Sequence, residues 1–354
     1  MLTVQPYGCA SRPDIEPLAT IFKGVLMGDA IKVDTLQKFL FEAAPVRGEL
    51  VEISAAWQQV LARRAYPHAV KTILGEMMAA AALLSANLKF DGVIVMQIHG
   101  DGPVRLLVVE CDSELQLRAT AKMKDDAIIE SDATLGQLVN QHGNGRFVIT
   151  LDPKDKMPGQ QPYQGIVPLD GDNVATVIEN YMLRSEQLDT KLWLAADATV
   201  SRGMLLQRLP QEGGHAVAPA AAKDATAAIE TLDAADAGDA WDRALALGAT
   251  LGQEELLTTD IATLLHRLFW EETIRVFDAR YPTFHCSCTR EKVGGMLKML
   301  GREEVEDALK DLDSLEIDCD FCGQHYEFDK VDCAQLFATE EPVETLQSPS
   351  KLRH

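Results

Sequence analysis

The alternation of hydrophobic and polar residues becomes regular at Asp34, whereas residues 1–33 show no sustained period. Apolar side chains at helical spacing predict helices over residues 69–84 and 173–184. Short alternating or continuous apolar runs predict strands at residues 49–53, 93–98, 104–110, 115–121, 147–151, 163–168, 191–195 and 203–209. Short turns between strands, interrupted by helices, predict an α+β fold with a mixed, mostly antiparallel sheet core.

The glycine-rich stretch Gly100-Asp-Gly-Pro103 lies between two of the predicted strands. It could be mistaken for a phosphate-binding loop, but it lacks the following helix and the Lys-Ser/Thr pair that such a loop requires. We therefore expect a hairpin turn at this position.

The composition changes sharply after the last of these strands. Residues 213–240 are mainly Ala and Asp with few large apolar side chains, so we expect a linker or a weak helix there. Order returns near Trp241, and Asp260 is expected to start a helix that runs to Phe269. A strand is expected at residues 273–277, which completes a mainly helical linker.

Length and charge restrict the classes of function. A chain of 354 residues is long enough for two or three domains with a sizeable core. The formal net charge of −21 argues against sequence-independent binding to nucleic acid or to an anionic membrane surface, because both need basic residues. No stretch is long and apolar enough to span a bilayer, and the N-terminus lacks a signal-peptide pattern, so we expect a cytoplasmic protein.

Four cysteines form two close pairs, Cys286-Ser-Cys288 and Cys319-Asp-Phe-Cys322, separated by thirty residues. The sequence between and after the pairs predicts two helices and two strands, at residues 293–300, 305–309, 315–317 and 326–328. Two close pairs on either side of a folded stretch are typical of a tetrahedral thiolate site for Zn²⁺. A module with so small a core is expected to need the metal in order to fold.

Other residues are weaker candidates for the site. His285 and His325 are possible substitute ligands, although four cysteines already complete a tetrahedral set. Cys111 lies in an apolar run and is expected to be a small core residue, whereas Cys9 and Cys333 are expected to have no part in the site. The sequence supports no nucleophile–base arrangement, so we expect no enzymatic activity.

The spacing of the cysteines leaves the purpose of the site open. One hypothesis is a static structural zinc module that serves contacts with other macromolecules. A second is a redox switch, because coordinated thiols are already deprotonated and react with oxidants, which would remove the ligands and release the metal. A third is a dithiol oxidoreductase using Cys319 and Cys322, although a strand rather than a helix start is predicted beside Cys319.

Several further motifs occur in a fixed order along the chain. They are Val46-Arg-Gly-Glu49, Leu88-Lys-Phe-Asp-Gly92, Gly100-Asp-Gly-Pro103, Tyr163-Gln-Gly165, Arg184-Ser-Glu-Gln-Leu188, Gly203-Met-Leu-Leu-Gln207, Leu268-Phe-Trp-Glu-Glu272, Cys286-Ser-Cys288-Thr-Arg-Glu and Cys319-Asp-Phe-Cys322-Gly-Gln-His-Tyr. With these residues the chain resembles the heat shock protein 33 family of redox-regulated holdase chaperones. The resemblance covers roughly residues 34–337, apart from the Ala/Asp-rich stretch.

The resemblance implies a chaperone core, a metastable helical linker and a small C-terminal zinc-binding domain. The expected parts are an N-terminal extension (1–33), the α+β chaperone core (34–210), the Ala/Asp-rich insertion (211–240), the metastable linker (241–278), the zinc-binding redox-switch domain (279–340) and a tail (341–354). The extension and the insertion depart from the family's pattern. Because the insertion lies where the linker should be, it could change how easily the linker unfolds.

The resemblance also implies a mechanism for the four cysteines. One Zn²⁺ would be bound by Cys286, Cys288, Cys319 and Cys322 in the reduced, inactive form. Oxidation would form the disulfides Cys286–Cys288 and Cys319–Cys322, release zinc and unfold the linker. The exposed surface would bind unfolding or oxidatively damaged proteins without ATP, and the oxidised chain would form homodimers.

Overall fold

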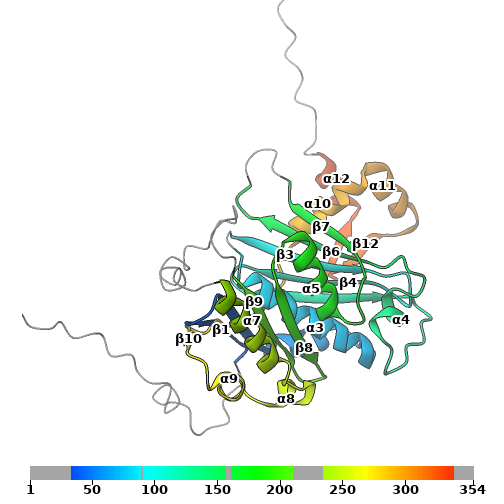
Figure 1. Ribbon diagram of the computed structural model, residues 1–354. Helices are drawn as coiled ribbons and strands as arrows, with labels where there is room; N and C mark the ends of the chain where they lie inside the picture. The colour runs from blue at the N-terminus through cyan, green and yellow to red at the C-terminus, as the bar shows by residue number, and fades with distance from the viewer. Residues whose placement is uncertain (1–32, 89–90, 157–160, 210–233, 339–354) are drawn as a thin grey trace, which may run out of the picture. The chain divides into compact units, whose positions relative to one another are not determined.

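The structure is a computed structural model that describes residues 33–88, 91–156, 161–209 and 234–338. The expected N-terminal extension, most of the Ala/Asp-rich insertion, the tail and Cys9 lie outside the described residues. The described part contains two large sheets, a long helix that contacts both, and a smaller C-terminal unit (Figure 1). The predicted α+β fold with mostly antiparallel pairing is confirmed.

The first sheet has five antiparallel strands in the order β10–β1–β2–β9–β8. These strands are β1 (Thr35–Phe41), β2 (Val46–Ile53), β8 (Thr190–Ala196), β9 (Ser201–Arg208) and β10 (Ile274–Val276). Nearly every residue of β2 and β9 is buried. Burial on both sides of a strand means that both faces of this sheet are covered.

The second sheet has six strands in the order β11–β5–β4–β3–β6–β7. These strands are β3 (Gly92–His99), β4 (Val104–Asp112), β5 (Gln116–Met123), β6 (Arg146–Pro153), β7 (Tyr163–Pro168) and β11 (Thr283–Phe284). β3 and β4 form the expected hairpin, closed by a hydrogen bond of 2.9 Å from the Gly100 amide to the Arg105 carbonyl. Only the short β11 is parallel to its neighbour, β5, among the described strands.

Helix α3 (His68–Ser85) fills the space between strands of both sheets. Every residue from 77 to 85 is buried, which is the pattern of a helix that is surrounded by protein. The run of four alanines at 79–82 keeps the helix narrow there. At Gly75 any side chain would collide with the core, since a β-carbon would lie 2.3 Å from that of Ala196.

Three further helices complete the core. They are α2 (Ala55–Leu61), α4 (Leu135–Val139) and α5 (Val174–Ser185). The buried carboxylate of Asp34 accepts hydrogen bonds from the amides of Ser54, Ala55 and Ala56, each at 2.7 Å, and so satisfies the N-terminus of α2.

The linker segment (residues 241–278) covers the face of the first sheet that is opposite α3. Its helices are the main part of α7 (Ala234–Gly248), α8 (Gln253–Thr258) and α9 (Ile261–Phe269). Leu50 and Val51 are neighbours on β2, yet Leu50 packs in the cluster with the linker and Val51 in the cluster with α3. The Phe269 ring lies 5.4 Å from that of Phe39 and 5.2 Å from that of Phe41, measured between centroids.

A buried ion pair lies under the same linker segment. Arg202 on β9 is 2.5 Å from the Glu52 carboxylate on β2, and its side chain is 3% exposed. The Arg202 guanidinium also donates hydrogen bonds to the carbonyls of Leu256, at 3.1 Å, and Thr259. It thereby satisfies acceptors at the C-terminus of α8, so this short helix is held to the sheet by a charge.

After α9 the chain runs from the edge of one sheet to the edge of the other. β10 pairs with β1, and the backbone of Arg280 exchanges hydrogen bonds of 2.7 and 2.9 Å with Leu36. β11 then adds to β5, where the amides of Thr283 and His285 donate to the carbonyls of Leu115 and Leu117, both at 3.0 Å. Residues 274–284 therefore join the edges of the two sheets.

The cysteine module (residues 285–338) follows β11. Its elements are α10 (Arg290–Leu300), α11 (Arg302–Asp311), β12 (Ser314–Asp318), β13 (His325–Asp329) and α12 (Lys330–Ala338). As expected, α10 ends at Gly301, which has a φ of +96° that an L side chain rarely adopts. The module has its own small apolar cluster of Val293, Leu297, Val305, Leu309, Phe328, Cys333 and Phe337.

Candidate metal centre

The structure brings the four predicted cysteines together. All four sulfur atoms lie within 4.8 Å of one another. The sulfurs of Cys286 and Cys319 are 3.7 Å apart, and those of Cys288 and Cys322 are 3.3 Å apart. Among the described residues this is the single group of His, Cys, Asp and Glu side chains that could hold a metal ion.

The sulfur positions fit a tetrahedral metal ion. With a Zn–S bond of about 2.3 Å, the sulfurs of a tetrahedral site are about 3.8 Å apart. The observed separations of 3.3 and 3.7 Å lie close to this value and far above the bond length of a disulfide, about 2.05 Å. All four residues are free thiols of intermediate exposure, so a cation could reach them from solvent.

Each pair of cysteines is held by a different local structure. Cys286 and Cys288 follow β11 and precede α10, whose N-cap is Thr289. Cys319 and Cys322 lie in the turn between β12 and β13, where the Cys319 amide donates to the Gln324 carbonyl at 2.9 Å and the Gly323 amide to the Cys319 carbonyl at 2.8 Å. Cys319 thus follows a strand, as predicted, and lacks the helix-start position of a thioredoxin-like dithiol.

Hydrogen-bond donors surround the sulfurs. Backbone amides of Phe321 and Cys322 point to the Cys319 sulfur, and that of Gln324 to the Cys322 sulfur. The Tyr326 hydroxyl donates to the Cys288 sulfur at 3.2 Å. Four thiolates on a divalent cation carry a net charge of −2, and donors of this kind stabilise it.

The donors act unequally on the thiols. Burial opposes ionisation of Cys288, but hydrogen bonds from Tyr326 and the neighbouring thiols outweigh it and lower the pKa of Cys288 to about 7. Burial raises the pKa of Cys319, and burial together with the other thiols raises the pKa of Cys322 to about 12. Of these three thiols Cys288 therefore ionises most easily, and a bound cation would favour ionisation of the other two.

The cluster also touches the core. The Arg118 guanidinium on β5 donates to the Cys286 sulfur at 3.5 Å and stacks on the Phe321 ring at 4.2 Å. Asp320, between Cys319 and Cys322, forms ion pairs with Lys122 on β5 at 2.6 Å and with Arg64 at 3.8 Å. The cysteine module therefore rests on β5 by charged side chains.

The two histidines named as substitute ligands are not in the metal-ligating group. His325 is bonded to Asp318 at 2.8 Å, which raises the pKa of His325, and both side chains are largely exposed. His285 lies beside Cys286, but it is fixed by its backbone hydrogen bond to Leu117. Neither belongs to the sulfur cluster.

The remaining described cysteines are buried apart from the cluster. Cys111 is fully buried between α3 and the second sheet, as expected, and burial raises the pKa of its thiol to about 12. Cys333 is 3% exposed and packs in the apolar cluster of the cysteine module, so its thiol has a packing role.

Three site residues could not be identified from the sequence. Arg118 and Lys122 are ordinary polar positions of a strand, and only the folding of β11 against β5 brings them to the cysteines. Tyr326 had a weak signal, since it lies on the predicted return strand close to the second cysteine pair.

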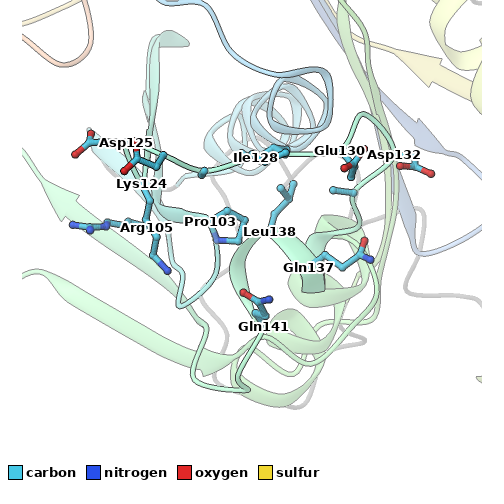
Figure 2. Close-up of a pocket in the computed structure, with 14 residues that line it drawn as sticks. Pro103, Arg105, Lys124, Asp125, Ile128, Glu130, Asp132, Gln137, Leu138 and Gln141 are labelled. Carbon is cyan, nitrogen blue, oxygen red and sulfur yellow. The ribbon is translucent and has the colours of Figure 1, made fainter.

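A separate open pocket of about 740 Å³ lies at the surface beside α4 (Figure 2). Leu138 points towards the loop that carries Ile128, and Pro103 of the β3–β4 turn lies between them and Arg105. Acidic side chains such as Glu130 and basic ones such as Arg105 share its lining. The four acidic residues Asp125, Asp126, Glu130 and Asp132 outnumber Arg105 and Lys124, so the lining has a net negative charge.

Within the residues that the structure describes, we find no helix with the length and hydropathy needed to cross a bilayer.

Comparison with known proteins identifies a family that shares this sequence, including the region of the four cysteines. The model of the Hsp33 protein family matches residues 34–329, which include all four cysteines. The chain is 50% identical over 304 residues to the 33 kDa chaperonin of Chromobacterium violaceum, covering 86% of this chain and 94% of that one. It is 46% identical over 308 residues to the 33 kDa chaperonin of Methylobacillus flagellatus, covering 87% and 95%.

The fold is similar to the crystal structure of a 33 kDa chaperonin, a heat shock protein 33 homologue, from Thermotoga maritima. The TM-score is 0.67 at 20% sequence identity, with 86% of this chain and 98% of that chain covered. At this identity the likeness supports the fold, while the family match and the closer sequences define the relationship. The chain belongs to the Hsp33 family of chaperones.

Proposed function

We propose that this protein is a redox-regulated, ATP-independent holdase chaperone. In the reduced form Cys286, Cys288, Cys319 and Cys322 would hold one Zn²⁺, and the protein would be inactive. Oxidation would form the disulfides Cys286–Cys288 and Cys319–Cys322, release the metal and undock the linker segment. The oxidised protein would bind unfolding proteins in the cytoplasm and tend to dimerise.

The observation that carries the proposal is the position of the thiol cluster. Four sulfurs that fit one metal ion lie on a small module with a minimal apolar cluster, and that module directly follows the linker segment. A module of this size depends on its metal for stability. Loss of the metal would therefore act on the chain between the module and the core.

The redox step requires only the four thiolates and an oxidant of the peroxide class. Each pair of thiolates loses two electrons to one hydrogen peroxide and forms one S–S bond. The peroxide takes up two protons and leaves as two water molecules. Two disulfides thus consume two peroxides and four protons, and the divalent cation is freed because no thiolate remains to bind it.

Undocking of the linker segment would expose apolar surface on both the first sheet and the linker helices. The face of the first sheet would expose Phe39, Leu50, Met204 and Leu206, which are buried against the linker helices. The helices would expose the opposite side of the same cluster, including Phe269. Contiguous apolar surface of this kind is what an unfolding protein can bind.

Zinc release and thiol loss, measured together during peroxide treatment, test the switch. We expect two disulfides for each zinc released, and peptide mapping should find the two pairs named above. A Cys111→Ser variant serves as a control, since Cys111 is buried on β4 and is not in the cluster. Zinc that stays bound while the four thiols remain free would support the alternative, a static structural module in a protein-interaction protein.

Chaperone activity is tested by the aggregation of a thermally unfolded client. Oxidised protein should suppress aggregation without ATP, and reduced zinc-bound protein should not. Equal suppression by both forms would contradict redox regulation. Absence of suppression by both would contradict the holdase function.

A further inference from the structure

Two kinds of charge pairing on β5 contribute to the contact between the core and the cysteine module. Arg118 and Lys122 both point to the outer side of this strand, where they meet the module. Lys122 pairs with the Asp320 carboxylate, which stays charged in any redox state. Arg118 instead donates to the sulfur of Cys286, a candidate metal ligand.

The geometry around Arg118 fixes its guanidinium in place. Glu110 on β4 lies 2.6 Å from one guanidinium nitrogen and accepts from Nε at 2.8 Å. Phe321 covers the guanidinium plane at 4.2 Å, and the side chain is 19% exposed. A cation that is oriented on three sides and largely shielded from water interacts more strongly with a nearby negative charge than an exposed cation does.

We propose that Arg118 is the positioning residue that couples the charge of the cysteine cluster to the docking of the cysteine module on β5. This inference rests on the proposed function and adds the contact by which the core responds to the switch. With metal bound, the cluster carries a net charge of −2 and Arg118 stabilises it. When Cys286 is part of a disulfide its sulfur carries no charge, and the guanidinium loses that partner.

Thermodynamic linkage makes this testable without any chaperone assay. If Arg118 couples metal binding to docking, then docking must strengthen metal binding by the same factor. The Zn²⁺ dissociation constant of the reduced full-length protein can be measured by competition with a chromophoric chelator. Docking can be followed by hydrogen exchange of the amides of Thr283 and His285, which donate to β5.

We expect Arg118→Gln to raise the Zn²⁺ dissociation constant about tenfold. This factor corresponds to the lower end of the free-energy range for losing a hydrogen bond to a charged group. Arg118→Lys should restore part of the loss, because it keeps the charge without the planar fork. Lys122→Gln is the matched control, since it removes the same charge from a neighbouring outward position. It should speed exchange at residues 283–285 but change the dissociation constant by less than about twofold.

Removal of zinc gives the second half of the test. Chelation should speed exchange at residues 283–285 clearly in the wild type and much less in Arg118→Gln. Unchanged exchange on β3 and β6 would show that the core of each variant is folded. The inference would be overturned if Arg118→Gln left the Zn²⁺ dissociation constant unchanged, or if Lys122→Gln raised it by the same factor. Neither result would affect the disulfide and zinc-release measurements that test the switch itself.

Discussion

The core holds its two neighbouring segments by different forces. The linker segment covers the first sheet with a buried apolar cluster in which Phe269 packs against Phe39 and Phe41. The cysteine module contacts Arg118 and Lys122 of the second sheet and Arg64 after α2, side chains that remain partly exposed. Apolar packing does not depend on the charge state of the cysteines, whereas the contact between Arg118 and Cys286 does, so a redox change would act first on the module.

The largest effect is expected at the apolar contact between the linker segment and the first sheet. Phe269→Ala should weaken docking of the linker by about 3–5 kcal/mol, since it removes a ring that is 1% exposed. Reduced, zinc-bound protein should then be cut by trypsin at Arg243 and Arg267. Trp270→Ala is the control, because that neighbouring ring is 69% exposed. Equal resistance of Phe269→Ala and wild type would show that packing does not hold the linker.

The buried ion pair under α8 should have the next largest effect. Glu52→Leu leaves the Arg202 charge buried without its carboxylate and should destabilise docking by about 3 kcal/mol. Adding Arg202→Met should recover part of this loss, because both charges are then absent, although the carbonyls of Leu256 and Thr259 lose their donor. Urea unfolding followed by the exchange of α8 amides measures both variants. A double variant as unstable as the single one would contradict this account.

A smaller effect is expected at the charged contact between the cysteine module and the core. Asp320→Asn removes the carboxylate shared by Lys122 and Arg64 and should weaken module docking by about 1 kcal/mol, typical of exposed pairs. High salt should have a similar effect on the wild type while leaving the linker contact unchanged. Glu304→Gln, which removes an equal charge from α11, is the control. Salt-insensitive exchange at residues 283–285 would contradict a charge-based contact.

The smallest effect concerns pH. The hydrogen bond to Asp318 raises the pKa of His325 above its unfolded value of about 6.5. The pair therefore stabilises the β12–β13 hairpin below that pH, and this contribution disappears as the pH rises through the folded-state pKa. With saturating zinc, hairpin amides should lose protection over this range, whereas His325→Gln should show a flatter profile. Identical profiles would exclude a role for the pair.

The sequence predicted structure best where a single local pattern was sufficient. Helical spacing predicted α3 and α10, Asp260 predicted the start of α9, and cysteine spacing predicted the sulfur cluster. Helices α2, α4, α8 and α12 were not predicted, because they are short and their apolar pattern covers one or two turns only. Most strands were predicted, but β1 and β11 were not, and the division of the strands into two sheets depends on contacts between distant residues.

The contacts of the site with the core were unpredictable for the same reason. Arg118 and Cys286 are 168 positions apart, and nothing local marks either as the partner of the other. β11 has two residues, too few to show a period, although it brings the cysteine module to β5. Local patterns thus predicted which four cysteines lie together, whereas tertiary structure determined what surrounds them.

The segment that joins the two sheet edges has a consequence for synthesis. All strands of the two sheets except β10 and β11 are complete by Arg208, and the pairing of β1 with β10 must wait for residues near Val276. At roughly 5–20 residues per second, translation needs several seconds to make the intervening chain. During that interval a nascent core can fold while its outer sheet face is still bare. The newly made protein would therefore pass through an uncovered form once in its life, before any oxidant acts.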